Sequence, residues 1–326
     1  MTTLVTGGTG KTGLPLARLL LNSNQPFLLA SRSGNAPEPF TGKGVRFDFF
    51  DKGTYENPFK ADSNIDRAYI VNPVMDDPYE PVTAFIDFAK SKGVKRFVLL
   101  LGTPFTKVHT SHGRIWGHLE NLGVEYTVLN ATYFTGTHFS SSVSDYKASC
   151  LWIRVISSTE NISTVLRTTI RDMNSIITAA GDGQVPFVGV DDVAQAAYDA
   201  LFAENSPNTD YIVIGPSLYT YDEVRVAFYL SVLALCAECT QHPQVAAMLT
   251  QLLGRKITHV RLTANELFER AVSKGFPPTL ARILVSYEEE VVATGKESAL
   301  VGKANTITGT RELKEFLEEN KSLWVV

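Results

Sequence analysis

The sequence predicts an α/β protein with a doubly wound parallel sheet and a small, mainly helical C-terminal subdomain. Two observations predict this fold class. A glycine cluster near the N-terminus stands between a short apolar run and an amphipathic segment, which is the order strand, tight turn, helix. Apolar, strand-like runs then alternate with segments of helical spacing over roughly the first 130 residues, as in parallel sheets built from βα units.

The glycine cluster fits two dinucleotide-binding spacings. Gly8, Gly10 and Gly13 satisfy G-x-G-x-x-G, and Gly7, Gly10 and Gly13 satisfy the looser G-x-x-G-x-x-G. Glycines allow positive φ in the turn, close approach of the backbone to a pyrophosphate and close packing of helix on strand. The following helix directs free N–H groups and its positive dipole end at the phosphates.

A Walker P-loop is the alternative phosphate-binding motif, suggested by Gly10-Lys11-Thr12. That motif requires a glycine five positions before Gly10, where this chain has Val5. The dinucleotide interpretation is therefore preferred, with a purely structural glycine turn as the remaining alternative. In this turn we expect the cofactor to be bound by Gly7, Gly8, Thr9, Gly10, Lys11 and Thr12.

The second predicted strand, residues 26–31, is followed by Arg32. In NAD-binding proteins an acidic residue near the end of this strand holds the ribose 2′-hydroxyl, whereas an arginine accommodates the 2′-phosphate of NADP. Arg32 can hold a phosphate through two parallel hydrogen bonds, and Lys11 can add a second charge. The sequence therefore favours NADPH over NADH, with a solvated loop charge as the alternative interpretation of Arg32.

Further strands are predicted at residues 45–50, 68–71, 96–101 and 125–129, and helices at residues 81–92 and 110–122. Ligands of such sheets bind at the carboxyl ends of the strands. Two more cofactor candidates, Asn72 and Gly102, therefore follow these strands, and a third, Asp48, lies within the strand predicted at residues 45–50. Asp48 stands where such folds contact the adenine, although a plain surface aspartate is an equally simple interpretation.

The second half of the chain is predicted to add a short strand and a helix at residues 184–201, with Asp191 near the helix cap. A strand at residues 211–214 follows, and from Tyr221 onward the pattern is mainly helical with one strand at residues 256–261. We expect residues 1–135 to form a Rossmann-type NADP(H)-binding core. Residues 136–326 then supply the remaining core elements and a substrate-covering subdomain.

Composition excludes several functional classes. The 326 residues are 44% hydrophobic and 20% charged, with a net charge of −4, so no basic surface for nucleic acid or anionic membrane is expected. The longest apolar run, residues 226–237, is too short to span a bilayer. The N-terminus lacks the basic and apolar regions of a signal peptide. We expect a cytoplasmic protein, and no feature of the sequence specifies an oligomeric state.

Neither the cysteines nor the histidines form a convincing site. The three cysteines cannot make a disulfide framework. Cys236 and Cys239 have redox-motif spacing but lack a surrounding glycine–proline turn and a second cysteine pair. Among the six histidines, His109 and His112 lie three apart without an acidic or cysteine partner nearby. No metal site is predicted.

The proton donor of ordinary short-chain dehydrogenases is missing. Those enzymes use a tyrosine with a lysine four residues later, and none of the twelve tyrosines here has that lysine. Two functions remain open: a protein that binds NADP(H) as a sensor, and a reductase whose substrate needs a hydride but no proton. An iminium ion is such a substrate, because hydride addition gives a neutral amine directly. No catalytic residue is assigned.

Seven short motifs resemble the NmrA-like fungal agroclavine/festuclavine dehydrogenases of ergot alkaloid biosynthesis. They are Gly7-Gly-Thr-Gly-Lys-Thr12, Pro26-Phe-Leu-Leu-Ala-Ser-Arg-Ser33, Phe85-Ile-Asp-Phe-Ala89, Arg96-Phe-Val-Leu-Leu100, Tyr126-Thr-Val-Leu129, Val185-Pro-Phe187 and Leu253-Gly-Arg-Lys-Ile-Thr-His259. The last motif is the most specific. The resemblance implies NADPH-dependent reduction of a tetracyclic iminium formed from chanoclavine-I aldehyde, a small-molecule alkaloid substrate. An NmrA-type sensor, or a reductase of another imine or a quinone, is the alternative.

Two departures from the family pattern lie near the expected nicotinamide end. The family reads His-x-His-Leu at Trp116-Gly-His118-Leu119, and Leu-Arg-Pro-Thr-Trp-Phe at Leu129-Asn-Ala-Thr-Tyr-Phe134. The substrate candidates are therefore Trp116, His118, Tyr133 and Phe134. His118 can position a substrate or simply lie on a helix surface. The three aromatic side chains can stack on an indole or a cation, or pack in the core.

Two stretches, residues 136–159 and 225–244, have no counterpart in the family pattern. They contain all three cysteines. Excising them restores family-like sequence on either side. Our hypothesis is that both are translated, unspliced introns, and genuine insertions are the alternative.

Overall fold

The computed structural model describes residues 1–134, 175–221 and 258–319, apart from residues 74, 76, 104, 106, 108, 109, 274, 275 and 277. The chain divides into two compact units. The first comprises Met1–Ala131 with Val190–Val213, and the second comprises Thr132–Gly189 with Ile214–Val326. Both stretches without a family counterpart, and the three cysteines within them, lie outside the described residues.

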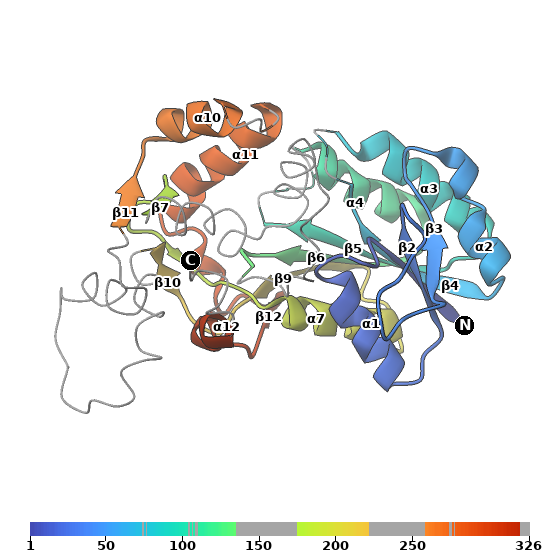
Figure 1. The fold of residues 1–326 in the computed structure, drawn as a ribbon. Coiled ribbons are helices and arrows are strands. Elements are labelled where there is room, and N and C mark those ends of the chain that lie inside the picture. Colours follow the sequence, from blue (N-terminus) through green and yellow to red (C-terminus); the bar gives the residue numbers. More distant parts are fainter. Residues whose placement is uncertain are drawn as a thin grey trace. The chain divides into compact units, whose positions relative to one another are not determined.

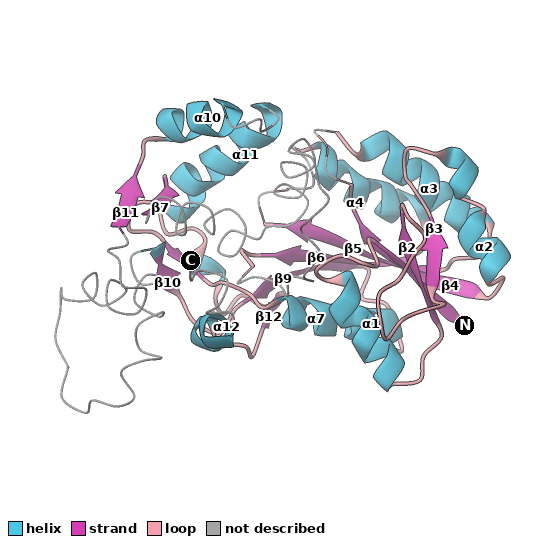
Figure 2. Ribbon diagram, viewed as in Figure 1, coloured by secondary structure: helices cyan, strands magenta, loops and turns pink. Residues whose placement is uncertain are grey.

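A parallel sheet forms the centre of the first unit. Its strands stand in the order β9-β6-β5-β4-β1-β2-β3 (Figure 2), and each neighbouring pair is parallel. The bounds are β1 (Thr2–Thr6), β2 (Phe27–Ser31), β3 (Gly44–Arg46), β4 (Ile65–Val71), β5 (Arg96–Gly102), β6 (Glu125–Ala131) and β9 (Thr209–Ile214). The strand order reverses at β1, which pairs with β2 on one side and β4 on the other. The predicted doubly wound sheet is confirmed, with its switch point at β1.

Helices lie on both faces of this sheet (Figure 1). Their bounds are α1 (Gly13–Asn22), η1 (Lys52–Thr54), α2 (Asn57–Ala61), α3 (Tyr79–Ser91), α4 (Ser111–Leu122) and α7 (Val190–Phe202). Helix α1 packs against α7, and α3 packs against α4. Helix α3 buries residues at positions i, i+3, i+4 and i+7, namely Val82, Phe85, Ile86 and Ala89, which is the apolar stripe of a core-facing helix. In the described part of the chain, no helix is long and apolar enough to cross a membrane.

The third strand is shorter than predicted. β3 ends at Arg46, although Phe47 and Phe49 continue the alternating pattern. Both side chains are buried, and the Phe47 ring lies 4.4 Å from that of Phe85 on α3. The Phe47 N–H still donates to the Ser31 carbonyl of β2 at 2.8 Å, but the residues after Phe47 turn away from the strand. The alternation of Phe47 and Phe49 therefore reflects burial against α3 beyond the end of β3.

The second unit combines short strand pairs with helices. Its bounds are β7 (Ser175–Thr178), β8 (Gln184–Val185), β10 (Tyr219–Thr220), β11 (Thr258–Arg261), α10 (Ala264–Ser273), α11 (Pro278–Tyr287), η4 (Glu288–Val292), η5 (Ser298–Leu300), β12 (Thr306–Thr308) and α12 (Leu313–Glu319). β11 pairs with β7 in parallel, and β10 pairs with β8 in the antiparallel sense. Helix α10 packs against α11, which continues directly into the π-helical turn η4.

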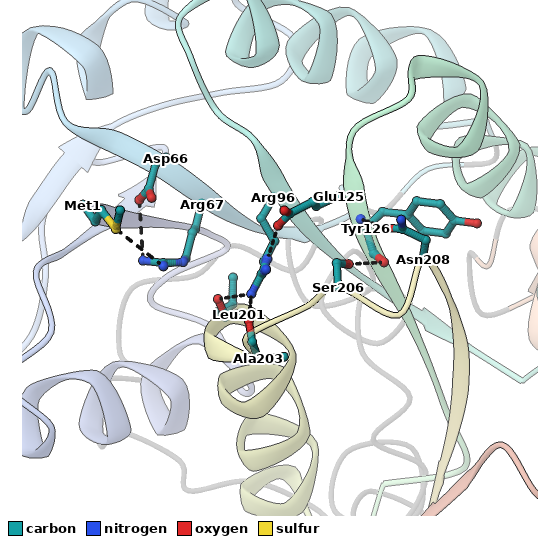
Figure 3. Close-up of polar contacts among 10 residues, drawn as sticks. All are labelled: Met1, Asp66, Arg67, Arg96, Glu125, Tyr126, Leu201, Ala203, Ser206 and Asn208. Carbon is teal, nitrogen blue, oxygen red and sulfur yellow. Dashed lines mark hydrogen bonds and ion pairs between the residues drawn. The ribbon is translucent and has the colours of Figure 1, made fainter.

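Arg96, at the start of β5, ties α7 to the sheet of the first unit (Figure 3). Its side chain is 7% exposed. Nε donates to the Glu125 carboxylate at 2.6 Å, and Nη1 donates to the carbonyl oxygens of Leu201 at 3.1 Å and Ala203 at 2.5 Å. These carbonyls belong to the C-terminal end of α7, where a cation is favoured by the helix dipole and satisfies acceptors that the helix leaves open.

The segment between α7 and β9 is anchored to β6 nearby (Figure 3). The Tyr126 N–H donates to Asn208 Oδ1 at 3.0 Å, and the Ser206 hydroxyl donates to the Tyr126 carbonyl at 3.0 Å. Asn208 has a φ of +48°, a conformation that asparagine tolerates better than most residues. These contacts lie at the amino ends of the strands, opposite the predicted ligand end.

Arg96→Leu should lower the free energy of unfolding by about 2–3 kcal/mol, because buried carbonyl acceptors lose their donor. Urea denaturation followed by circular dichroism measures this change. Lys95→Leu is the matched control, since Lys95 is exposed beside Arg96, and it should stay within about 0.5 kcal/mol of the parent protein. Equal stability of the two variants would show that the Arg96 contacts do not hold α7.

Candidate functional site

The glycine turn joins β1 to α1 through its own backbone. Gly7 has a φ of +60°, a conformation that glycine adopts without strain. The Gly10 N–H donates to the Gly7 carbonyl at 2.8 Å, and the Gly8 N–H donates to the Ala30 carbonyl of β2 at 3.1 Å. The turn is therefore held by one hydrogen bond within itself and by a second one to the neighbouring strand.

The positions of Gly8 and Gly13 have no room for a side chain. A Cβ atom added to Gly8 would lie 2.8 Å from Leu29 Cα, and one added to Gly13 would lie 2.5 Å from the Gly7 carbonyl oxygen. The result is a bare backbone cradle at the N-terminus of α1. Such a cradle fits a pyrophosphate, because N–H groups and the positive helix end are accessible to the anion. Lys11 follows directly and is partly buried.

Arg32 lies where β2 ends and is exposed. No hydrogen bond or ion pair to Arg32 occurs within the described ranges. The turn after it is shaped by the Gly34 N–H, which donates to Ser31 Oγ at 3.2 Å. Ser31 is in register with Arg46 of β3. A second arginine therefore lies on the strand next to this turn. Within the described residues, the Arg46 guanidinium forms one ion pair, with Asp51 at 3.7 Å. Both side chains are exposed, so this pair contributes little to the stability of the fold.

Asn72 follows β4 and has an unsatisfied side chain. Its Oδ1 and Nδ2 atoms are both buried and have no hydrogen-bond partner among the described residues. Buried amides are nearly always hydrogen-bonded, so this one is expected to have a partner beyond the described residues. A dinucleotide at the carboxyl ends of the strands can provide it. Gly102, the last residue of β5, is also buried, and its carbonyl accepts from the Phe105 N–H at 2.9 Å.

Asp48 shapes its own turn. Its Oδ1 accepts from the Phe50 N–H at 3.0 Å, and its backbone N–H donates to Thr54 Oγ1 at 2.9 Å. The carboxylate is therefore oriented by the turn that follows β3. The Phe50 side chain beside it is 59% exposed.

The two candidates on α4 pack locally. Trp116 is packed against the core of the first unit, and the Lys107 ammonium lies 5.2 Å from its ring centroid. His118 Nε2 lies 2.7 Å from Asp87 Oδ1 of α3. Its ring meets that of Tyr79 edge-on at 6.3 Å.

Tyr133 and Phe134 belong to the second unit and are 4% and 2% exposed. The Tyr133 ring lies 6.4 Å from that of Phe187 and 6.1 Å from that of Tyr287. Phe134 forms a parallel bridge with Val188. Both side chains are thus placed within aromatic and apolar surroundings of that unit.

His112, in the first turn of α4, is a buried residue to which the sequence analysis assigned no role. It is 7% exposed and stacks on Phe105 at 4.4 Å. Burial lowers its pKa to about 4, so the imidazole is neutral at physiological pH. A neutral histidine is a weak proton donor.

Two glutamates of the second unit are also unusual, and no sequence signal singled them out. Burial raises the pKa of Glu288 to about 7 and that of Glu297 to about 8. Glu288 Oε2 accepts from the Ala179 N–H at 2.8 Å, and Glu297 accepts from the Tyr287 hydroxyl. In the described ranges, no group of three or more His, Cys, Asp or Glu side chains could hold a metal ion.

Comparison with curated proteins finds relatives over the whole chain. Agroclavine dehydrogenase of Claviceps fusiformis is 34% identical, covering 100% of this chain and 99% of its own length. Festuclavine synthase II of Penicillium roqueforti is 33% identical, with 99% and 100% covered. Festuclavine dehydrogenase of Aspergillus fumigatus is 32% identical, with 100% and 99% covered. No protein-family model matches the chain.

Solved structures share the fold at low identity. An NADPH-dependent quinone oxidoreductase of Escherichia coli in complex with NADPH has a TM-score of 0.65 and 19% identity, covering 97% of this chain and 99% of its own. The triphenylmethane reductase of Citrobacter sp. in complex with NADP(H) has a TM-score of 0.63 and 18% identity, with the same coverage. These likenesses show the fold alone.

Gly13→Ala should destabilise the protein by about 1–3 kcal/mol, because the new methyl group collides with the Gly7 carbonyl. Thermal denaturation measures this loss. Gly117→Ala is the control: a methyl group there meets no atom within 4 Å, and alanine favours the helix by about 0.5–1 kcal/mol. If Gly13→Ala left the stability of the protein unchanged, the tight contact between the turn and the helix would be contradicted.

Proposed function

The chain belongs to the family of fungal agroclavine dehydrogenases and festuclavine synthases, and from this membership we propose that it reduces a clavine-type iminium to a tertiary amine with NADPH. The observation that carries the cofactor part is the glycine cradle beside the orphaned Asn72 amide. The proposed substrate is supported by the relatives, because they are named after the clavine alkaloids agroclavine and festuclavine. The protein would act in the cytoplasm on a small molecule.

The proposed cofactor site assigns separate parts of NADPH to separate residues. Backbone N–H groups of the turn at residues 7–12 bind the pyrophosphate, apart from those of Gly8 and Gly10, which donate to carbonyls of the protein. Arg32 binds the 2′-phosphate, and Arg46 on the adjacent strand adds a second charge. The side-chain amide of Asn72 forms hydrogen bonds to the cofactor. Gly102, which has no side chain, leaves space for the cofactor. Asp48 is proposed to face the adenine.

Nicotinamide, when bound, supplies a hydride. At an iminium the hydride adds to carbon while the C=N electron pair moves to nitrogen, so the product is a neutral amine and no proton donor is needed. This requirement agrees with the absence of a tyrosine–lysine pair from the sequence and with the neutral His112. The contribution of the protein is orientation of the two reactants. Trp116, His118, Tyr133 and Phe134 are the proposed substrate-handling residues.

A second candidate function is a catalytically silent NADP(H) sensor. The missing proton donor favours it as much as it favours iminium chemistry. The two functions differ in turnover, because a sensor binds NADPH without consuming it.

Incubating the protein with NADPH and the iminium formed from chanoclavine-I aldehyde decides between them. The reductase should oxidise NADPH in step with formation of the tertiary amine, measured by loss of absorbance and by mass spectrometry. NADPH binding without oxidation would support the sensor instead. A carbonyl or quinone substrate of similar size serves as the control for the need for a C=N⁺ group.

Arg32→Ala should weaken NADPH binding by about tenfold or more and leave NADH binding nearly unchanged, because one charged hydrogen-bonding partner of the 2′-phosphate is lost. Fluorescence titration of each cofactor gives the two dissociation constants. Arg18→Ala, which removes an exposed arginine from α1, is the matched control and should change neither. Equal losses for NADPH and NADH would show that Arg32 does not recognise the 2′-phosphate.

A further inference from the structure

Four buried aromatic rings follow one another within the second unit. The Tyr287 and Tyr133 centroids are 6.1 Å apart, Tyr133 and Phe187 are 6.4 Å apart, and Phe187 and Tyr221 are 5.6 Å apart. None of the four side chains is more than 8% exposed. Aromatic faces attract cations, and three of these rings also carry a hydroxyl group.

Two carboxyl groups lie among these rings. Glu297 is fully buried and accepts from the Tyr287 hydroxyl. Glu288 is held by the Ala179 N–H at 2.8 Å and is partly buried. Burial, and then the charges of both carboxylates, raise the pKa of Tyr221, so its hydroxyl stands within electrostatic reach of both. We call Tyr133, Tyr221, Tyr287, Glu288 and Glu297 the acid–tyrosine cluster.

The two carboxyl groups of the acid–tyrosine cluster have no ion-pair partner in the described part of the chain, while the ring of His259 lies 6.3 Å from that of Tyr221. No lysine, arginine or histidine there forms an ion pair with Glu288 or Glu297. Glu297 Oε1 and the Tyr221 hydroxyl are both buried without a hydrogen-bond partner among described residues. Buried carboxylates and hydroxyls without partners are costly, and proteins retain them chiefly where function requires them.

We propose that the acid–tyrosine cluster binds the positively charged nitrogen of an organic amine or iminium. A carboxylate neutralises the charge, and the tyrosine faces surround the apolar groups attached to the nitrogen. A metal ion is a poorer match, because the described ranges hold no group of three or more metal-ligating side chains. The inference rests on the proposed function in one respect: an iminium substrate and a protonated amine product would both present this charge.

The test is Glu288→Gln, which keeps an oxygen acceptor for the Ala179 N–H and removes the charge. Agroclavine, a tertiary amine, is the probe, and its dissociation constant is measured by calorimetry without cofactor at about pH 7, where the amine is protonated. The variant should bind it at least about tenfold more weakly, as expected when a charged contact is lost. Glu289→Gln, an exposed neighbour with the same charge change, should bind it like the parent protein.

Thermal denaturation of the probe-free protein supplies a second measurement. If no side chain neutralises Glu288, Glu288→Gln should melt at or above the temperature of the parent protein at about pH 8, because a buried charge is removed. A lower melting temperature would show that an internal cation pairs with Glu288 and would overturn the proposal. Unchanged probe binding by Glu288→Gln would overturn it as well.

These outcomes are independent of the proposed function. Charge-dependent binding of the amine by a protein that does not oxidise NADPH would sustain the acid–tyrosine cluster and reject the reductase. Iminium reduction by the parent protein together with charge-independent amine binding would do the reverse.

Discussion

The first unit depends on close backbone contacts at the glycine turn between β1 and α1, where a side chain would not fit. At Gly8 and Gly13 an added carbon would approach neighbouring backbone atoms to 2.8 Å and 2.5 Å. This closeness lets α1 begin directly after β1 and rest on the sheet. It also leaves the amide groups at the helix start uncovered. Packing of the helix and access for an anion therefore follow from the same contact, and neither can be altered separately.

The sequence predicted the sheet well because parallel strands are buried on both faces and are apolar almost throughout. β5 has this character most clearly, and α3 shows the helical spacing of a half-buried helix. The same method placed a strand over residues 45–50, where only Gly44–Arg46 pairs as β3. Alternating burial of Phe47 and Phe49 matches a strand pattern, although both rings owe their burial to contacts with Phe85 of α3 after β3 has ended.

Candidate site residues could be proposed from the sequence where they are contiguous in the chain. The turn at residues 7–13 and Arg32 follow directly from strand ends, so their position is implied by the fold. Arg46 was not identified because its place beside Ser31 depends on the register of β3. Glu288 opens a run of three glutamates that would be interpreted as a charged surface. Long-range contacts, such as that with the Ala179 N–H, partly bury the first of them.

The contacts of Arg96 have a consequence for synthesis of the chain. Its guanidinium meets carbonyl groups that lie 105 and 107 residues further along the sequence. When β6 leaves the ribosome, the strand that will cover its outer edge, β9, has not yet been translated. An apolar, unpaired strand edge is prone to association with other chains. The edge of β6 therefore stays unpaired while about 80 further codons are translated, which takes about 4 to 16 seconds at usual rates of elongation, before β9 pairs with it.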